Sequence, residues 1–267
     1  MAGFNMLLEG FSRKLLWIGT AILSLILTIL FLLPASWMGV LIERQTHGRL
    51  CLGDVQGSFW SGSAFVGVAA TANDPVTPLF PGRFSWEISP LILLTQIDLE
   101  LQNSESLSAP LKVSGNFSEW HVSPASIVLP TERLEGLGAP LNTIGPSGNL
   151  HLSWNNLQFT REGTLLSAQG QLQLDLAEMA SRLSPVRPLG SYKMSFDLHG
   201  TSADVNLITQ TGPMMLSGTG ALNSGRFQFS GKAWAQEGQE TKLANLLNLL
   251  GQRRKDGDKD VIALEFK

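Results

Sequence analysis

Apolar and polar residues alternate over many short segments of this chain, and this period of two constrains the fold most. Such a period puts one set of side chains on each face of a strand, which is typical of antiparallel strands with one buried face. The alternation is clearest at 96–101, 149–154, 171–176, 193–198 and 226–229. Weaker patterns predict further strands at 83–88, 111–117, 157–161, 205–211 and 261–266. The sequence therefore predicts a mainly β domain, built as a meander, a sandwich or an open curved sheet.

Glycine recurs inside the predicted strands, at Gly115, Gly170, Gly218 and Gly231. A glycine within a strand indicates a bulge, a tight bend or a close approach of another backbone. Repetition of this feature favours a strongly curved antiparallel sheet.

An uncharged apolar run extends from Leu15 to Leu33. About twenty apolar residues cross the hydrocarbon core of a bilayer as a helix. Arg13 and Lys14 precede the run, and positive charge beside a first span tends to stay in the cytoplasm. We therefore predict a cytoplasmic tail at 1–14, one transmembrane helix at 15–33 and a β-rich domain at 38–267 beyond the membrane. A cleaved signal peptide is the alternative, although its apolar region is usually shorter.

A few short helices are expected in the β-rich domain. Helical spacing predicts them at 130–137, 176–183 and 241–250, the last of which ends at Gly251. The charged segment 252–260 is predicted to be a solvated turn into the last strand. The prolines of Pro185-Val186-Arg187-Pro188 either divide the domain into two β-rich halves or are crossed by one continuous sheet.

The composition argues against several classes of function. A net charge of −3 with only 15% charged residues gives no reason to expect nucleic-acid binding. The four histidines share no metal-ligand spacing, and no nucleophile elbow, phosphate loop or zinc motif is present. The acidic residues fall mostly in the polar positions of alternating strands, where carboxylates keep ordinary pKa values. We therefore predict a protein that is not an enzyme, with no cofactor, no metal and no small-molecule substrate.

The single cysteine, Cys51, lies between two leucines. The simpler interpretation is a small apolar side chain in a strand. A reactive or intermolecular thiol is the alternative.

Five segments, taken together and in order, resemble the type II secretion system protein N family of Gram-negative inner membranes. They are Leu33-Pro34-Ala35-Ser36-Trp37, then 57–64 (GSFWSGSA), 183–192 (LSPVRPLGSY), 211–220 (TGPMMLSGTG), and 229–233 (FSGKA) with its leucine-rich helix. Met214-Met215 departs from the leucine expected there, and the change is conservative. The resemblance implies an accessory component of the secretion machinery, with one inner-membrane span, a periplasmic body and no enzymatic activity. Its partners would be other inner-membrane and periplasmic components of that machinery.

These segments supply the candidate structural or interaction residues. Trp60 between Gly57 and Gly62 is either a core corner or an exposed docking surface. Pro188-Leu189-Gly190 is predicted to be a rigid turn before Tyr192, whose hydroxyl is expected to be buried and hydrogen-bonded. Gly212-Pro213 is predicted to be a turn between strands. The candidate set is Gly57, Trp60, Gly62, Pro188, Leu189, Gly190, Tyr192, Gly212, Pro213 and Gly218.

Two functions from different classes remain after this reasoning. The first is a scaffold that binds other secretion components through side chains and a free sheet edge. The second is a membrane-tethered sheet that binds or transfers lipid, with an acyl chain held by Ile97, Leu99, Leu101, Leu172, Leu174 and Leu176. The two differ in whether that apolar face is covered or open. A cell-wall enzyme is a third, weaker alternative.

Overall fold

The fold was analysed in a computed structural model, which describes residues 17–22, 24–25, 28–71, 74–138, 141–223, 225–256 and 259–266. The predicted cytoplasmic tail at 1–14 lies outside the described residues. The predicted transmembrane segment is described only in part, and its described residues from Trp17 to Phe31 are helical. Among the described residues, no helix has both the length and the apolar character needed to cross a membrane.

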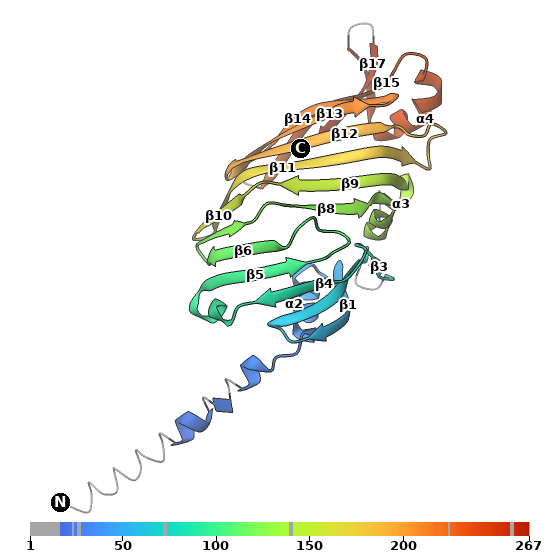
Figure 1. The fold of residues 1–267 in the computed structure, drawn as a ribbon. Coiled ribbons are helices and arrows are strands. Elements are labelled where there is room, and N and C mark those ends of the chain that lie inside the picture. The colour runs from blue at the N-terminus through green and yellow to red at the C-terminus, as the bar shows by residue number, and fades with distance from the viewer. Residues whose placement is uncertain are drawn as a thin grey trace, which may run out of the picture.

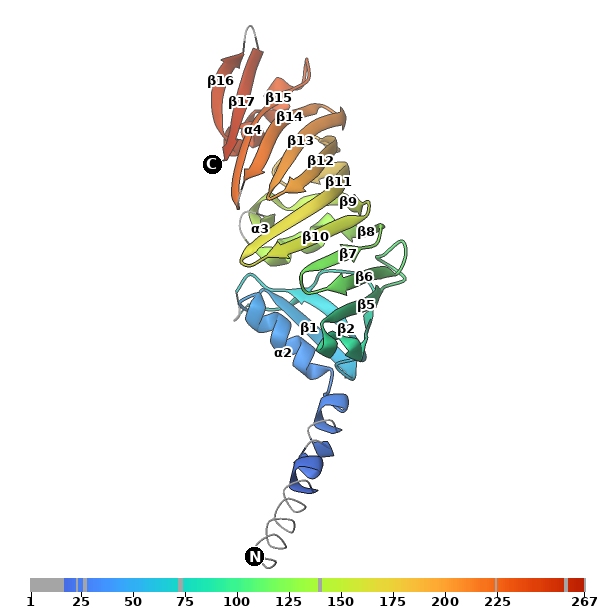
Figure 2. The same ribbon diagram turned by 90° about the vertical axis from the view of Figure 1, so that its left-hand side faces the viewer.

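The body of the protein is one antiparallel sheet, in which strands follow one another along a single long axis (Figures 1 and 2). Most pairs join strands that are consecutive in the sequence, so the sheet is largely a meander, but β2 also pairs with β4, β7 with β10, β9 with β11 and β15 with β17. The strands are β1 Leu50–Gly57, β2 Ser61–Val68, β3 Thr77–Pro78, β4 Phe84–Ile88, β5 Gln96–Gln102, β6 Leu111–Asn116, β7 Glu119–Val122, β8 Ala125–Pro130, β9 Pro146–Trp154, β10 Leu157–Glu162, β11 Leu165–Ser181, β12 Gly190–Gly200, β13 Ser202–Thr211, β14 Met214–Asn223, β15 Arg226–Ala235, β16 Gln252–Asp256 and β17 Lys259–Phe266.

The predicted mainly β, antiparallel and open-sheet architecture is confirmed, and each predicted strand lies within or overlaps an observed one. Of the three arrangements left open, the structure is one open sheet, largely in meander order, and not a sandwich. The sheet continues across Pro185–Pro188, because β11 pairs with β12 from Ala168 to Met179. The prolines therefore do not divide the domain.

Strand β11 corrects one helix prediction, since 176–183 was predicted to be helical. The strand instead extends to Ser181, with Ala180 opposite Ser147 and Ser181 opposite Pro146 of β9. A bulge between Ala177 and Ala180 interrupts the alternation, and Glu178 adopts a positive φ of 52°. The irregular spacing that resembled a helix is the spacing of this bulge. Backbone partners on both sides, β9 and β12, favour the extended chain.

The register of the sheet separates two faces, which we call the apolar face and the polar face. Opposite residues in paired strands point to the same side, so the register can be followed from β4 to β15. The apolar face carries Trp86, Leu99, Val113, Val122, Leu152, Leu174, Met194, Leu207, Leu216 and Phe229. The polar face carries Glu87, Glu100, Lys112, His121, His151, Asp175, Lys193, Asn206, Ser217 and Lys232.

Short helices pack at both ends of the sheet, and the two that lie between β8 and β9 in the sequence pack beside those strands in its middle. They are α2 Ser36–Gln45, the 3-10 helices η1 Pro90–Leu94 and η2 Thr131–Leu137, α3 Leu141–Ile144, and α4 Glu240–Leu250. Helix α4 and η2 were predicted at almost these bounds. Helix α2 was not predicted, because Trp37, Val40 and Leu41 on one side and Met38 and Ile42 on the other give no one-sided apolar pattern.

The chain end forms a hairpin rather than the predicted turn. Residues 252–256 form β16, which pairs with β17 from Gln252 opposite Ala263 to Asp256 opposite Lys259. The run of charged residues indicated a loop. The segment is a strand because its backbone pairs with that of the neighbouring apolar strand β17. Residues 257–258 lie outside the described part.

Candidate interaction surfaces

The first group of candidate residues lies where the sheet meets the apolar N-terminal segment, a region we call the junction. The indole Nε1 of Trp60 donates a hydrogen bond to the carbonyl oxygen of Leu30, at 2.9 Å. The backbone N–H of Phe59 donates to the carbonyl of Leu33 at 2.8 Å, and that of Ala35 donates to the carbonyl of Gly57 at 3.2 Å. The turn between β1 and β2 therefore holds the end of the N-terminal helical segment. This gives Trp60 a structural role, and its docking role stays a prediction.

Both glycines of the junction permit close backbone approach. Gly57 has a φ of +90°, and a Cβ there would lie 2.5 Å from the carbonyl oxygen of Ser61. A Cβ on Gly62 would lie 2.5 Å from Cζ2 of Trp86. Trp86 is only 6% exposed, and its Nε1 donates to the carbonyl of Phe59 at 3.0 Å. Sequence reasoning selected Trp60 and missed Trp86, although Trp86 occupies an apolar position of a predicted strand.

The second group forms one corner at the other end of the sheet, which we call the far corner. Two segments that are distant in sequence meet there, since the N–H of Met214 donates to the carbonyl of Leu189 at 2.9 Å. The N–H of Leu189 donates to the carbonyl of Met179 at 2.7 Å. Leu189 and Met214 are buried with Leu243, Leu246 and Leu247 of α4. The predicted turn at Pro188-Leu189-Gly190 and the predicted turn at Gly212-Pro213 are therefore parts of one packed unit.

Tyr192 completes the far corner. Its side chain is 4% exposed, and its hydroxyl donates to the carbonyl oxygen of Met214 at 3.0 Å. Burial raises the pKa of the Tyr192 phenol well above its usual range, so the hydroxyl keeps the proton that it donates. This is the buried, hydrogen-bonded tyrosine that the sequence suggested.

Gly218 lies outside both the junction and the far corner. It lies on β14 opposite Gly231 of β15, and a Cβ on Gly218 would lie 2.5 Å from Cζ of Phe229. The glycine lets the ring of Phe229 lie flat on the apolar face. The structure thus divides the candidate residues into two separate groups, with Gly218 on the face between them.

The helices leave the middle of the apolar face open. Helix α2 packs its Met38 toward Leu52 and Val55, while α4 packs on Ala233 and Ile262. Within the described ranges, no helix packs closely on the middle of β11 and β12. The apolar side chains there remain part-exposed, namely Leu152, Leu172, Leu174, Phe196 and Leu198.

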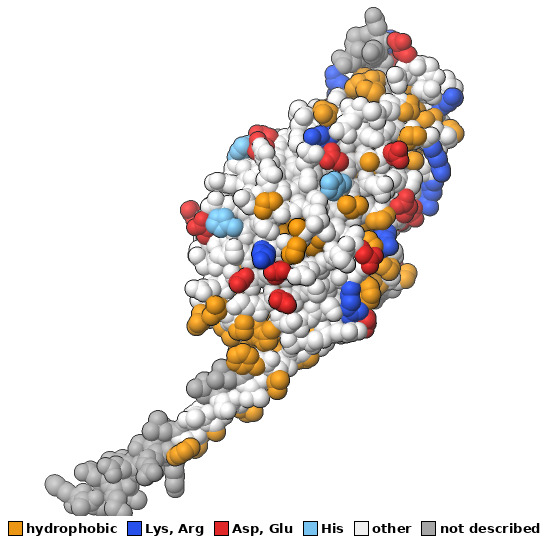
Figure 3. Space-filling view, in the orientation of Figure 1, with side chains coloured by type: hydrophobic (Ala, Val, Ile, Leu, Met, Phe, Trp, Pro, Cys, Tyr) orange, Lys and Arg blue, Asp and Glu red, His pale blue; other side chains and the backbone are white. Residues whose placement is uncertain are grey.

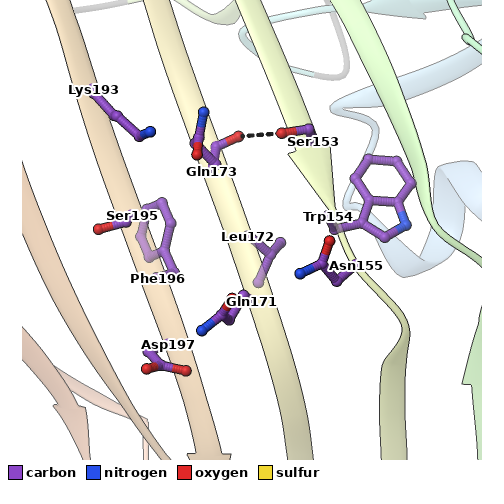
Figure 4. A pocket seen from close by; sticks show the side chains of 10 residues that line it. All are labelled: Ser153, Trp154, Asn155, Gln171, Leu172, Gln173, Lys193, Ser195, Phe196 and Asp197. Atoms are coloured by element: carbon purple, nitrogen blue, oxygen red, sulfur yellow. Dashed lines mark hydrogen bonds between the residues drawn. The ribbon is translucent and has the colours of Figure 1, made fainter.

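The polar face offers a shallow hollow between β9, β11 and β12 (Figure 4). Its polar lining includes Gln171, Gln173, Lys193, Ser195 and Asp197, with one cation and one carboxylate among them. Figure 3 shows acidic, basic and histidine side chains scattered over a broad face of the sheet rather than gathered at one point. A mixed, scattered face of this kind is typical of solvated or protein-contacting surface.

The described residues contain no group of three or more His, Cys, Asp or Glu side chains placed to hold a metal ion. Nε2 of His199 lies 3.5 Å from Oδ2 of Asp197 and 3.8 Å from Oδ2 of Asp204, and all three side chains are more than two-fifths exposed. Cys51 is part-buried in β1, and its Sγ donates to the carbonyl of Gly48 at 3.7 Å. That contact agrees with the simpler interpretation of the cysteine.

The two outer strands of the sheet, β1 and β16, differ. Strand β1 carries a bulge between Gly53 and Gln56, and Asp54 has a positive φ of 48°. The Arg83 guanidinium binds both the carboxylate of Asp54, at 2.6 Å, and its carbonyl oxygen. Hydrogen bonds from Arg83 and then from Gln56 lower the pKa of the Asp54 carboxyl. A bulge and an occupied carbonyl make β1 a poor edge for another strand.

Comparison with protein families shows a match over most of the chain. The family model described as type II secretion system (T2SS), protein N matches residues 48–261, from the start of β1 into β17. Searches of the curated proteins and of the solved structures found no match. The matched region includes the junction turn, the far corner and both faces of the sheet.

Proposed function

Because this chain belongs to the type II secretion system protein N family, we propose that it serves type II secretion as a non-enzymatic scaffold. In this proposal, the apolar segment 15–33 anchors the chain in the inner membrane with residues 1–14 in the cytoplasm. The sheet then lies in the periplasm, where it binds other components of the secretion machinery. Contacts between the junction turn and Leu30 support a fixed connection between anchor and sheet.

The free outer strand β16 is the observation that carries this proposal. In the described part of the chain, β16 pairs with β17 alone. An outer strand presents backbone N–H and C=O groups that can accept a further strand from a partner. The opposite edge, β1, is blunted by its bulge and by Arg83, so β16 is the better docking edge.

The chemistry around β16 favours an acidic partner segment. Three consecutive basic residues, Arg253, Arg254 and Lys255, are exposed on this strand. Arg254 pairs with Glu265 at 2.7 Å, and Arg253 donates to Oδ1 of Asn248 at 3.1 Å. Arg253 and Lys255 line a hollow whose other residues include Trp234 and Leu247 and the acidic Glu237, Glu240 and Asp260. Charged edge strands resist indiscriminate pairing, so a complementary partner is required. We therefore propose that β16 takes up an extended, acidic segment of another secretion component.

Reversing the charge of this edge tests the proposal. We expect the double variant Arg253→Glu, Lys255→Glu to fold normally, because both side chains are exposed. The variant would replace electrostatic attraction at this edge by repulsion. Each 1.4 kcal/mol of binding free energy that is lost weakens the affinity for the partner by about tenfold. Secretion of a type II substrate by a deletion strain that carries this variant should therefore fall several-fold. The measurement is secreted enzyme activity, normalised to the amount of variant protein in the membrane fraction.

The matched control is Arg161→Glu, Arg226→Glu, which makes the same charge change at exposed positions on β10 and at the end of β15 that does not pair with β17. The control should restore secretion as well as the native chain does. Equal secretion by the two double variants would show that β16 is not the docking edge.

The open apolar face supports a second candidate function, which is binding or transfer of lipid. Leu172, Leu174 and Phe196 are part-exposed on a face that runs from the junction toward the far corner. These apolar side chains can bind a ligand through hydrophobic contacts. An acyl chain fits them because it needs no hydrogen bonds. The two candidate functions differ in the molecule that contacts Leu174 in the cell, which is lipid if the sheet binds lipid and is not lipid if the sheet is only a scaffold.

A further inference from the structure

Exposed leucines gather on the short helix η1, between β4 and β5. Leu91 is 47% exposed, Leu93 is 53% exposed and Leu94 is 71% exposed. Single exposed apolar side chains are ordinary, but three on one turn form a patch that marks an interaction site. The η1 helix contains no charged residue that would solvate it.

Helix α2 presents a second exposed apolar surface. Trp37, Val40 and Leu41 are 61%, 47% and 48% exposed, and their spacing of three and four puts them on one side of the helix. Arg44 continues this side one turn later. The opposite side carries Met38, which packs with Leu52 and Val55 of β1. An outward apolar stripe that ends in a basic residue is typical of a helix lying in a membrane interface.

Both surfaces lie at the point where the N-terminal apolar segment reaches the sheet. Helix α2 starts three residues after Leu33. Trp60, which binds Leu30, accepts a hydrogen bond on its carbonyl oxygen from the N–H of Ile88 at 2.7 Å, and η1 begins two residues after Ile88. In Figure 3, hydrophobic side chains gather where the body meets the N-terminal segment. One short network of contacts thus fixes both surfaces beside the end of that segment.

We propose that Leu91, Leu93, Leu94, Trp37, Val40 and Leu41, which we call the membrane rim, rest in the interfacial layer of the bilayer. The occupant is the lipid surface because the rim adjoins an uncharged apolar segment long enough to span that bilayer. Tryptophan and a basic side chain are the residue types that this layer favours. The inference rests on the proposed anchor at 15–33.

Insertion of the membrane rim into the interfacial layer fixes the orientation of the sheet relative to the bilayer. The long axis then rises from the membrane, with β1 near the lipid surface and the far corner and β16 farthest from it. The path through paired strands runs from β1 through β2, β4 to β7, β10 to β15 and β17 to β16, which is thirteen spacings. At about 4.8 Å per spacing, this path is about 60 Å long. The docking edge is therefore held well away from the bilayer.

A fluorescent probe at the rim tests this placement. The full chain, with Cys51→Ser as background, receives a single cysteine by Leu94→Cys and is labelled with the environment-sensitive dye NBD. It is reconstituted in vesicles of phosphatidylethanolamine and phosphatidylglycerol that contain a lipid spin-labelled near the headgroup. We expect strong loss of NBD fluorescence at position 94. A second variant, Leu41→Cys on α2, should show the same loss.

The matched control is Leu249→Cys, a leucine of α4 that is 70% exposed, as Leu94 is, but lies at the other end of the sheet. Position 249 should show no loss above that of a water-soluble dye. No quenching at positions 94 and 41 would overturn the proposal and leave the rim to a protein partner. Equal quenching at 94 and 249 would also overturn it, since the whole sheet would then lie on the lipid. Flotation of the protein with the vesicles tests the anchor separately. Chains held by the anchor alone would float with the vesicles but show no quenching of NBD at position 94 or 41.

Discussion

Replacing Leu243 by alanine is expected to lower the free energy of unfolding by about 3 kcal/mol, within the range seen for buried leucines. Leu243 is fully buried at the centre of the contact between α4 and the sheet. It belongs to a buried cluster with Leu189, Met214, Ala233 and Ile262, so truncation would leave a cavity among residues from three strands and the loop before β12. Helix α4 has no side-chain cap at its N-terminus, and packing therefore supplies most of its stability.

The loss should be local, because each strand of a single-layer meander contacts only its neighbours. Amide hydrogen exchange should accelerate in α4, β15, β17 and the far corner, while β4 and β5 keep their protection. Leu249→Ala is the control, since Leu249 is 70% exposed and its truncation should change stability by less than about 0.5 kcal/mol. If Leu243→Ala were no more destabilising than Leu249→Ala, α4 would not be packed on the sheet as described.

Gly212→Ala is expected to disrupt the far corner, at a cost of about 3 kcal/mol or more from backbone strain and steric overlap together. Gly212 has a φ of +118°, which side-chain-bearing residues rarely adopt. A Cβ there would meet the Cα of Gly190 and lie 2.6 Å from the carbonyl oxygen of Leu189. These are backbone atoms, which cannot rotate away. The bond from Met214 N–H to Leu189 would therefore be broken or lengthened.

Gly200→Ala provides the matched comparison, because Gly200 also has a positive φ, +70°, but has open space around its Cβ position. Its cost should be limited to about 1 kcal/mol, that of a left-handed residue. The difference between the two variants in urea denaturation gives the cost at Gly212 beyond that of an ordinary left-handed residue, which is the steric overlap together with the extra backbone strain at a φ of +118°. Equal stabilities would mean that the two segments of the far corner are not in contact.

Much of the sheet could be predicted from the sequence because one face is apolar and the other polar. Alternation of the kind seen at 171–176 and 193–198 reports directly on that difference, and both segments lie in the observed strands β11 and β12. The open sheet could not be distinguished from a sandwich, since both give each strand one apolar and one polar face. Only the contacts between strands, which alternation does not encode, decide between them.

The errors fall where tertiary contacts outweigh local pattern. The end of β11 looked helical because the bulge at Ala177–Ala180 shifts the apolar spacing. The charged segment at 252–256 looked like a loop because its pairing partner, not its own composition, makes it a strand. Helix α2 was hidden because its outward side is as apolar as its inward side, which is the feature that now suggests the membrane rim.

The role of the candidate residues in binding stays a prediction, and their arrangement could not be read from the sequence. Turns at Pro188–Gly190 and Gly212–Pro213 could be expected from proline and glycine alone. Their meeting in one far corner depends on the pairing of β12 with β13, which no local pattern specifies. Likewise, nothing in the sequence indicates that Trp60 bonds to a carbonyl thirty residues earlier.

Site-specific photo-crosslinking in living cells tests the scaffold proposal most directly. A photoreactive residue would replace Arg253 on β16, Leu174 on the apolar face and Gln171 on the polar face, in three separate full-length chains. We predict a discrete adduct between position 253 and another secretion component, with no comparable adduct at 171. Lipid adducts at 174 without any protein adduct at 253 would contradict the scaffold account and favour lipid binding.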